Sequence, residues 1–95
     1  KLPLIQKEAE PVWHQYVIRT CQRECLIDFL KRNGIQTLVH YPIPPHLSEA
    51  YSYLGIKEGQ LPITEQYARQ VLSLPLYDGM SDEEVEYVIQ VINRY

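Results

Sequence analysis

Three closely spaced prolines, Pro42, Pro44 and Pro45, constrain this chain more than any other feature. Proline fixes its own φ and has no backbone N–H, so neither a helix nor an inner strand can run through them. They follow residues 35–39, a short and mostly β-branched run that predicts a strand. The chain must therefore leave this strand through a stiff, extended loop.

The proline loop carries three side chains that can bind a ligand: His40, Tyr41 and His46. Because proline also restricts the residue before it, these side chains would lose little freedom on binding. We expect His40 and Tyr41 to contact a ligand; alternatively, one of them packs locally while the other faces water, since side chains alternate along an extended chain. For His46, contact with a ligand hydroxyl and capping of the short helix that follows both remain open.

Hydrophobic periodicity predicts the other elements. Residues 12–19 favour a first strand that contains His14 as an interior histidine, and residues 72–76 favour a third strand. Thr20 can cap a helix that Gly34 ends, and residues 48–54 can form one or two helical turns. The inward positions of that first long helix are Cys25, Leu26, Phe29 and Leu30.

Two further helices follow, one beginning at Pro62 and one at a capping box formed by Ser81 and Glu84. The expected inward residues are Ile63, Tyr67, Ala68 and Val71 in the former and Val85, Val88, Ile89 and Ile92 in the latter. The order of elements indicates an α/β (α+β) fold. We expect a two-layer sandwich whose small, mainly antiparallel sheet of about three strands has helices packed on one face.

Charge and composition exclude several classes of function. The chain has 95 residues and a formal net charge of -3, with no basic stripe for nucleic acid. No apolar run approaches the roughly 18 residues that span a bilayer, so we expect no membrane partner and a cytoplasmic location. Cys21 and Cys25 are too few for a disulfide framework, and the three histidines match no usual metal-ligand spacing.

Residues 1–11 show no clear period and read as a linker from a larger domain that is missing, which leaves residues 12–95 as one domain. Arg19 and Arg23 could bind a substrate phosphate or carboxylate, but surface ion pairs to Glu24 or Asp28 account for these two arginines equally well. Tyr51 and Tyr53, near the proline loop, are candidates for contact with a ligand or partner subunit.

Several segments, taken in order, resemble the small carboxy-terminal domain of the DegT/DnrJ/EryC1/StrS family of pyridoxal-phosphate-dependent sugar aminotransferases. They are residues 13–19 (WHQYVIR), 34–37 (GIQT), 40–46 (HYPIPPH), 53–55 (YLG), 71–77 (VLSLPLY) and 80–85 (MSDEEV). The resemblance covers about residues 12–92, and the tripeptide at 13–15 resembles members that act on the 3-keto group of a thymidine-linked 6-deoxyhexose.

The resemblance implies a fold-type I enzyme, a homodimer when full length, that passes the amine of glutamate to a keto group on a nucleotide-linked sugar. In similar enzymes the position of His40 and Tyr41 lies near the sugar and cofactor, and His46 is the third residue expected to bind the substrate. Lys1, Lys7, Lys31 and Lys57 are the only lysines, and none stands in a family-like Schiff-base setting. The catalytic lysine and the cofactor ligands are therefore expected upstream, and this chain alone is expected to be inactive and to bind no pyridoxal 5'-phosphate.

Two alternatives to an enzyme domain remain. The chain could be a non-catalytic module that kept the fold for protein association, or part of a regulator that retains the cofactor and senses a sugar or antibiotic. An upstream lysine, a carboxylate for the pyridine nitrogen and phosphate donors would favour the enzyme.

Overall fold

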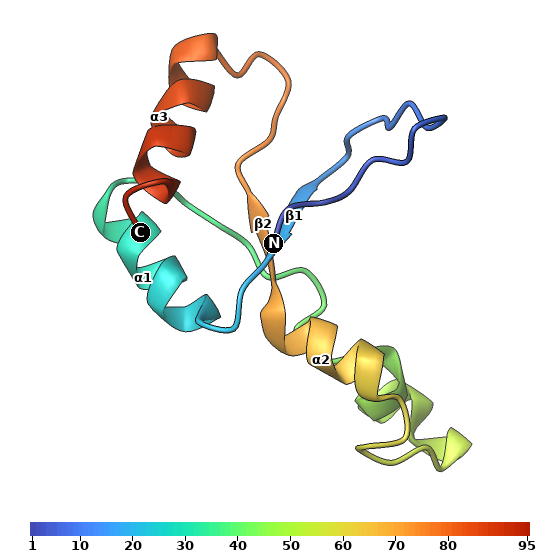
Figure 1. The fold of residues 1–95 in the computed structure, drawn as a ribbon. Coiled ribbons are helices and arrows are strands. Elements are labelled where there is room, and N and C mark those ends of the chain that lie inside the picture. The colour runs from blue at the N-terminus through green and yellow to red at the C-terminus, as the bar shows by residue number, and fades with distance from the viewer.

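The computed structural model describes all of residues 1–95 as two strands, three α-helices and two short 3-10 helices. In chain order the elements are β1 (Tyr16–Arg19), α1 (Arg23–Arg32), η1 (Pro45–Leu47), η2 (Glu49–Leu54), α2 (Pro62–Gln70), β2 (Val71–Leu74) and α3 (Asp82–Ile92). Strands β1 and β2 lie side by side at the centre of the molecule, with α1 and α3 to one side of them (Figure 1). The expected mixture of helices and a small antiparallel sheet is confirmed.

The sheet has two strands instead of the expected three. β1 and β2 pair antiparallel, with Tyr16 opposite Leu74 and Arg19 opposite Val71. The strand expected at residues 35–39 is reduced to a single bridge, in which Leu38 and Ser73 exchange backbone hydrogen bonds of 3.1 and 2.8 Å. The prolines close behind leave this segment no length for a longer ladder. The two-layer sandwich stays a prediction.

The core is small and lies where α1 and the end of α3 meet the strands. Its six buried apolar residues are Ile18, Leu26, Leu30, Ile35, Leu72 and Val91. The phenol of Tyr87 on α3 donates a 2.9 Å hydrogen bond to the carbonyl of Asn33, which ties α3 to the end of α1. We call α1, α3 and the two strands the main body.

The start of α1 differs from the prediction, whereas its end agrees with it. The helix begins at Arg23, with Gln22 as its N-cap, and Thr20 instead accepts a 3.1 Å hydrogen bond from the Gln22 amide. The expected stop is confirmed, because Gly34 takes a φ of 75° directly after the helix. Leu26 and Leu30 face inward as predicted, whereas Cys25 is exposed.

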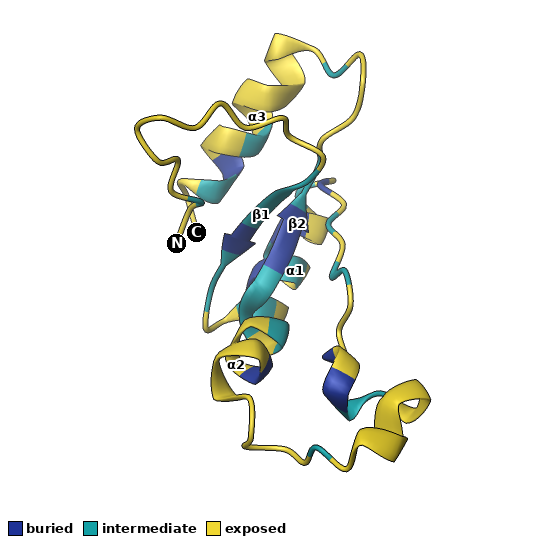
Figure 2. Cartoon of the chain, turned by 90° about the vertical axis from the view of Figure 1, so that its right-hand side faces the viewer, coloured by how far each residue is buried: buried dark blue, intermediate teal, exposed yellow.

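Helix α3 begins as predicted, with Ser81 and Glu84 forming a complete capping box. Its buried face is different. Val91 is the buried residue, whereas Val85 and Ile89, both expected inward, are exposed. Figure 2 shows the reason: only the end of α3 nearest the carboxy terminus is covered, while its first turns extend beyond the strands and are exposed.

Helix α2, η1 and η2 form an arm, residues 45–70, that extends away from α1 and α3 (Figure 1). Helix α2 begins at Pro62 as predicted. Its predicted inward face is wrong, because Ile63 is 71% exposed and Tyr67 is also exposed, while Glu65 is 4% exposed. The helix projects from the sheet, so its apolar positions have no core to face.

None of the helices combines the length and the apolar character that crossing a membrane requires.

Candidate functional site

The proline loop leaves the sheet from a fixed point on β2. Ser73 of β2 makes both backbone hydrogen bonds with Leu38, and its hydroxyl lies 2.8 Å from Nδ1 of His40. Ser73 is buried and His40 is half-buried. The imidazole of His40 is therefore held by its Nδ1 side, which leaves Nε2 without a protein partner in the structure.

Of the three candidate residues in the loop, Tyr41 is the one that faces solvent, with 81% of its surface exposed. It is also the one non-glycine residue with a positive φ, 55°. A left-handed conformation is disfavoured for a bulky residue, and such strain is often found at sites that hold a ligand. The His40 side chain thus contacts Ser73, whereas the Tyr41 side chain faces solvent. This matches the alternative in which one of the two side chains packs locally and the other faces water.

His46 lies on the arm, not beside His40. It is the middle residue of η1, is 7% exposed, and its Nε2 lies 3.2 Å from Oε1 of Glu65. It does not cap the following helix, whose N-cap is Ser48. The prediction that His46 contacts a ligand stays a prediction, but in this structure Nε2 is engaged by Glu65.

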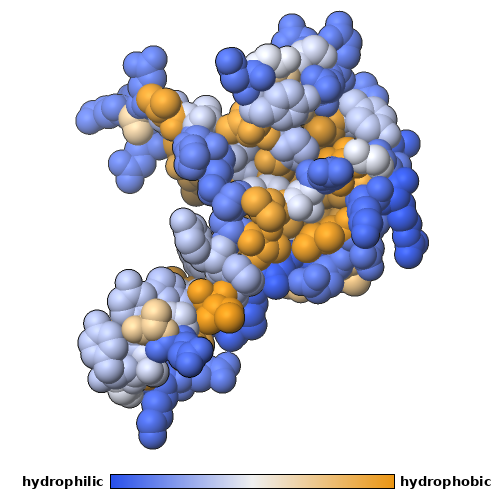
Figure 3. Space-filling view, turned by 180° about the vertical axis from the view of Figure 1, so that it is seen from behind, coloured by the Kyte–Doolittle hydropathy of each residue, from blue (hydrophilic) through white to orange (hydrophobic).

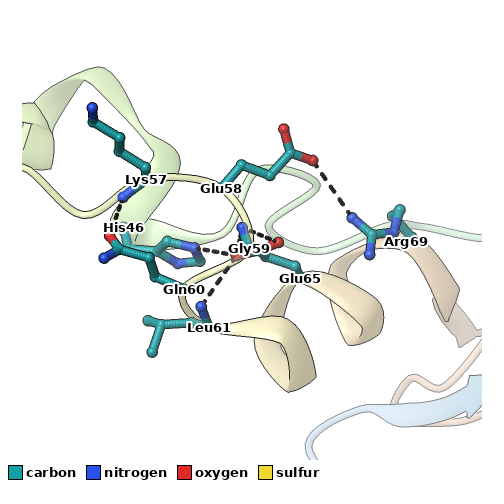
Figure 4. Close-up of polar contacts among 8 residues, drawn as sticks. All are labelled: His46, Lys57, Glu58, Gly59, Gln60, Leu61, Glu65 and Arg69. Carbon is teal, nitrogen blue, oxygen red and sulfur yellow. Dashed lines mark hydrogen bonds and ion pairs between the residues drawn. The ribbon is translucent and has the colours of Figure 1, made fainter.

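Glu65 is the residue that the sequence interpretation missed. Its Oε1 accepts hydrogen bonds from the amides of Gly59 (2.9 Å) and Leu61 (3.2 Å), and its Oε2 lies 2.9 Å from the Gly59 amide (Figure 4). Chiefly because of the Gly59 hydrogen bond, the pKa of Glu65 lies below its usual value, although burial opposes this. Its place in the first turn of a helix, where orphan amides need acceptors, was the available signal.

A groove of about 870 Å³ runs along the main body beside the loop. Its walls include His14, His40 and Ser73, with Glu83, Glu84 and Tyr87 contributed by α3. Figure 3 shows apolar side chains gathered over the middle of the main body and bordered by polar ones. The structure thus brings His14 and His40 to one groove that Tyr41 and His46 do not line.

The prediction that His14 is an interior histidine of the first strand is wrong. His14 precedes β1 and is exposed, so it is not the interior histidine of a strand.

At the α3 end of the groove, the Ser81 amide donates to Glu84 and lowers the pKa of that carboxyl. Glu84 in turn raises the pKa of the Tyr77 hydroxyl, which it hydrogen-bonds.

Arg19 and Arg23 join the arm to the main body. The guanidinium of Arg19 lies 3.8 Å from the ring centre of Tyr67 and donates to the Gln70 side chain at 2.9 Å. Arg23 donates to the Ala68 carbonyl at 2.6 Å and pairs with Glu24 at 3.0 Å. Of the two roles considered for these arginines, ligand binding and ion pairing, the ion pair from Arg23 to Glu24 is therefore present. Both arginine side chains also contact residues of α2.

The groove beside His40 lacks the lysine that a pyridoxal phosphate site requires. Such a site needs a lysine beside phosphate donors and a carboxylate for the pyridine nitrogen. None of the four lysines lines the groove beside His40. No group of three or more His, Cys, Asp or Glu side chains is placed to hold a metal ion.

Comparison with known proteins identifies the family. The model of the DegT/DnrJ/EryC1/StrS aminotransferase family matches residues 1–93. The chain belongs to this family. It spans about a quarter of the length of the curated relatives it matches.

Three relatives illustrate the match. The dTDP-3-amino-3,6-dideoxy-alpha-D-galactopyranose transaminase of Aneurinibacillus thermoaerophilus is 45% identical over 94 residues, which are 99% of this chain and 25% of that protein. The pleiotropic regulatory protein of Geobacillus stearothermophilus is 45% identical over 84 residues, 88% of this chain and 23% of that protein. The crystal structure of S. venezuelae DesV in complex with a ketimine intermediate superposes with a TM-score of 0.91 at 42% identity, covering 98% of this chain and 25% of that one.

Proposed function

We propose that this chain is the carboxy-terminal part of a sugar aminotransferase that transfers an amino group from glutamate to a nucleotide-linked keto-sugar. The observation that carries the proposal is the 45% identity, over 99% of this chain, to a protein named as a dTDP-aminosugar transaminase. Within the family match, residues 12–95 are proposed as the small domain and residues 1–11 as the linker to a large domain. The relative's name also supports a dTDP-linked 3-keto-6-deoxyhexose as substrate.

In this proposal the proline loop forms the sugar-facing edge of the small domain. The free Nε2 of His40 and the exposed phenol of Tyr41 are suited to hydrogen-bond sugar hydroxyls. His46 is also proposed as a substrate residue, through the part of its ring that Glu65 does not engage. The role of these groups is to bind and orient the sugar and to exclude water when the site closes.

The cofactor is proposed to be pyridoxal 5'-phosphate, which supplies the electron sink for amino transfer when bound. Its lysine and phosphate donors would come from the large domain, because none of the four lysines here lines the groove. We accordingly propose that the 95-residue chain alone is inactive and binds no cofactor. An absorbance band from pyridoxal phosphate that persists in the purified chain after gel filtration would contradict this.

The partners are proposed to be the large domain and, in the full-length protein, a second subunit of a homodimer in the cytoplasm. Val85 and Ile89 on α3 and Ile63 on α2 are exposed apolar residues that a covering domain or subunit would bury. No partner of nucleic acid or membrane type is proposed.

The test is a transamination assay of the full-length protein with L-glutamate and a dTDP-linked 3-keto-6-deoxyhexose. The proposal expects 2-oxoglutarate and the dTDP-aminosugar in equal amounts, measured by mass spectrometry. If the protein binds nucleotide sugars but forms no 2-oxoglutarate with any keto-sugar, the enzyme proposal is wrong.

A regulatory function is the second candidate, because the Geobacillus relative, named as a regulatory protein, is as similar in identity as the transaminase. A domain that senses a sugar would keep the rigid loop while the full-length protein turned over no substrate. Saturable sugar binding without 2-oxoglutarate in the assay above would favour this function. A non-catalytic association module would show neither.

A further inference from the structure

We propose that Glu65 is a positioning residue that acts through His46 to hold the proline loop, and with it the backbone of Tyr41, in the observed conformation. The structural part of this inference concerns the chain alone. Its consequence for catalysis rests on the proposed aminotransferase function.

The backbone of Tyr41 needs such support. With a φ of 55° it occupies the left-handed region, which bulky residues rarely adopt. A conformation of this kind persists where the surrounding structure over-determines it. The Tyr41 side chain is 81% exposed and makes no hydrogen bond that would hold it there. The restraint must come from the flanking residues.

Two clamps flank Tyr41 in the sequence. On one side, Leu38 and His40 are both bonded to Ser73, through two backbone hydrogen bonds and a 2.8 Å side-chain contact. On the other side, Nε2 of His46 lies 3.2 Å from Glu65. Of the five residues between His40 and His46, three are prolines with fixed φ. A displacement of His46 is therefore passed along a stiff backbone to Tyr41.

The second clamp is itself anchored firmly. The Glu65 carboxylate is 4% exposed and accepts hydrogen bonds from the Gly59 and Leu61 amides, so the loop before α2 surrounds it (Figure 4). Ser73 and Glu65 also lie on directly connected elements, because β2 follows α2 without a break. The two clamps thus fix the ends of residues 38–46 relative to each other.

The experiment compares Glu65→Gln with Glu58→Gln in the full-length protein. Glu58 lies in the loop before α2, close to Glu65 in sequence, and undergoes the same chemical change, but it is exposed and its one ion pair, to Arg69, is 3.9 Å long. A neutral amide at position 65 offers one acceptor oxygen in place of two, and its NH₂ would face the amide donors. Crystal structures of both variants give the φ of Tyr41, and steady-state kinetics give KM for the dTDP-keto-sugar and for glutamate separately.

We expect Glu65→Gln to move Tyr41 out of the left-handed region and to raise KM for the keto-sugar about tenfold, with KM for glutamate changed less than about twofold. Glu58→Gln should match the wild type in both measurements. His46→Gln, whose amide NH₂ can take the place of Nε2, should retain the Tyr41 conformation, whereas His46→Leu should lose it. If Glu65→Gln does not fold, the comparison of His46→Gln with His46→Leu decides whether the contact between His46 and Glu65 holds the Tyr41 conformation.

A Tyr41 φ that stays near 55° in Glu65→Gln, or in His46→Leu, overturns the positioning role. A displaced Tyr41 with an unchanged KM for the keto-sugar overturns its link to substrate binding. If the wild-type protein has no aminotransferase activity, the proposed function fails, while the crystal structures still decide whether Glu65 positions Tyr41.

Discussion

Replacing Leu30 by alanine should remove a large part of the stability of this chain. Leu30 is fully buried, and the apolar core contains only six residues in all. Removing a buried leucine side chain to the β-carbon costs the lost burial plus the cavity left behind, about 3 kcal/mol. In a domain of this size that corresponds to a fall in melting temperature of about 12–24 °C. Few other core residues remain to close the cavity, which argues against a smaller value.

The assay is urea unfolding of the 95-residue chain followed by circular dichroism, with the midpoint and slope fitted separately. The matched control is Ile63→Ala, an aliphatic position in a helix that is 71% exposed and should stay within about 0.5 kcal/mol of the wild type. A loss below about 1 kcal/mol for Leu30→Ala, or equal losses for both variants, would show that the core does not lie where α1 meets the strands.

Two further predictions concern carboxylates and caps. Ser81→Ala removes the hydroxyl that accepts from the Glu84 amide at 3.3 Å and should cost about 1 kcal/mol, measured by urea unfolding. The folded-state pKa of Glu65 is below its ordinary 4.5, so the Glu65 carboxylate binds a proton more readily in the unfolded chain than in the folded one. The contribution of the ionised Glu65 carboxylate to stability is therefore present above pH 4.5 and is lost as the pH falls below 4.5. The unfolding midpoint of the wild type should therefore drop more steeply on acidification below pH 4.5 than that of Glu65→Gln, and parallel curves would contradict the assignment.

Local signals in the sequence located the ends of elements well. Pro62 at the start of α2, the capping box at Ser81 and the stop at Gly34 all depend on the backbone chemistry of one turn, and all three are present. The position of the proline loop followed from the fixed φ of its prolines in the same way.

The buried faces could not be predicted as well, because they depend on what each helix packs against. The apolar pattern of α2 indicated Ile63 as an inward residue, yet the helix projects from the sheet and buries Glu65. The β-branched run at residues 35–39 indicated a strand, yet only Leu38 bridges to Ser73. Periodicity reports that a face is apolar, not that this chain provides the surface to cover it.

The candidate site was predicted in part. His40 and Tyr41 lie at the start of the segment that carries the prolines, but the burial of His46 beside a carboxylate 19 residues away needed the tertiary structure. Nothing in the sequence marks this histidine and this glutamate as buried, since glutamate is mostly exposed in proteins and histidine is intermediate. Their pairing emerges only when η1 and α2 come together in the arm.

The central claim is that the proline loop, not the groove as a whole, faces the sugar substrate. It is tested most directly by comparing His40→Ala with His14→Ala in the full-length protein, because both side chains line the same groove while only His40 belongs to the loop. With the dTDP-keto-sugar varied, we expect kcat/KM to fall at least about tenfold for His40→Ala and less than about twofold for His14→Ala, with both variants folded by circular dichroism. Equal losses in the two variants would contradict the claim.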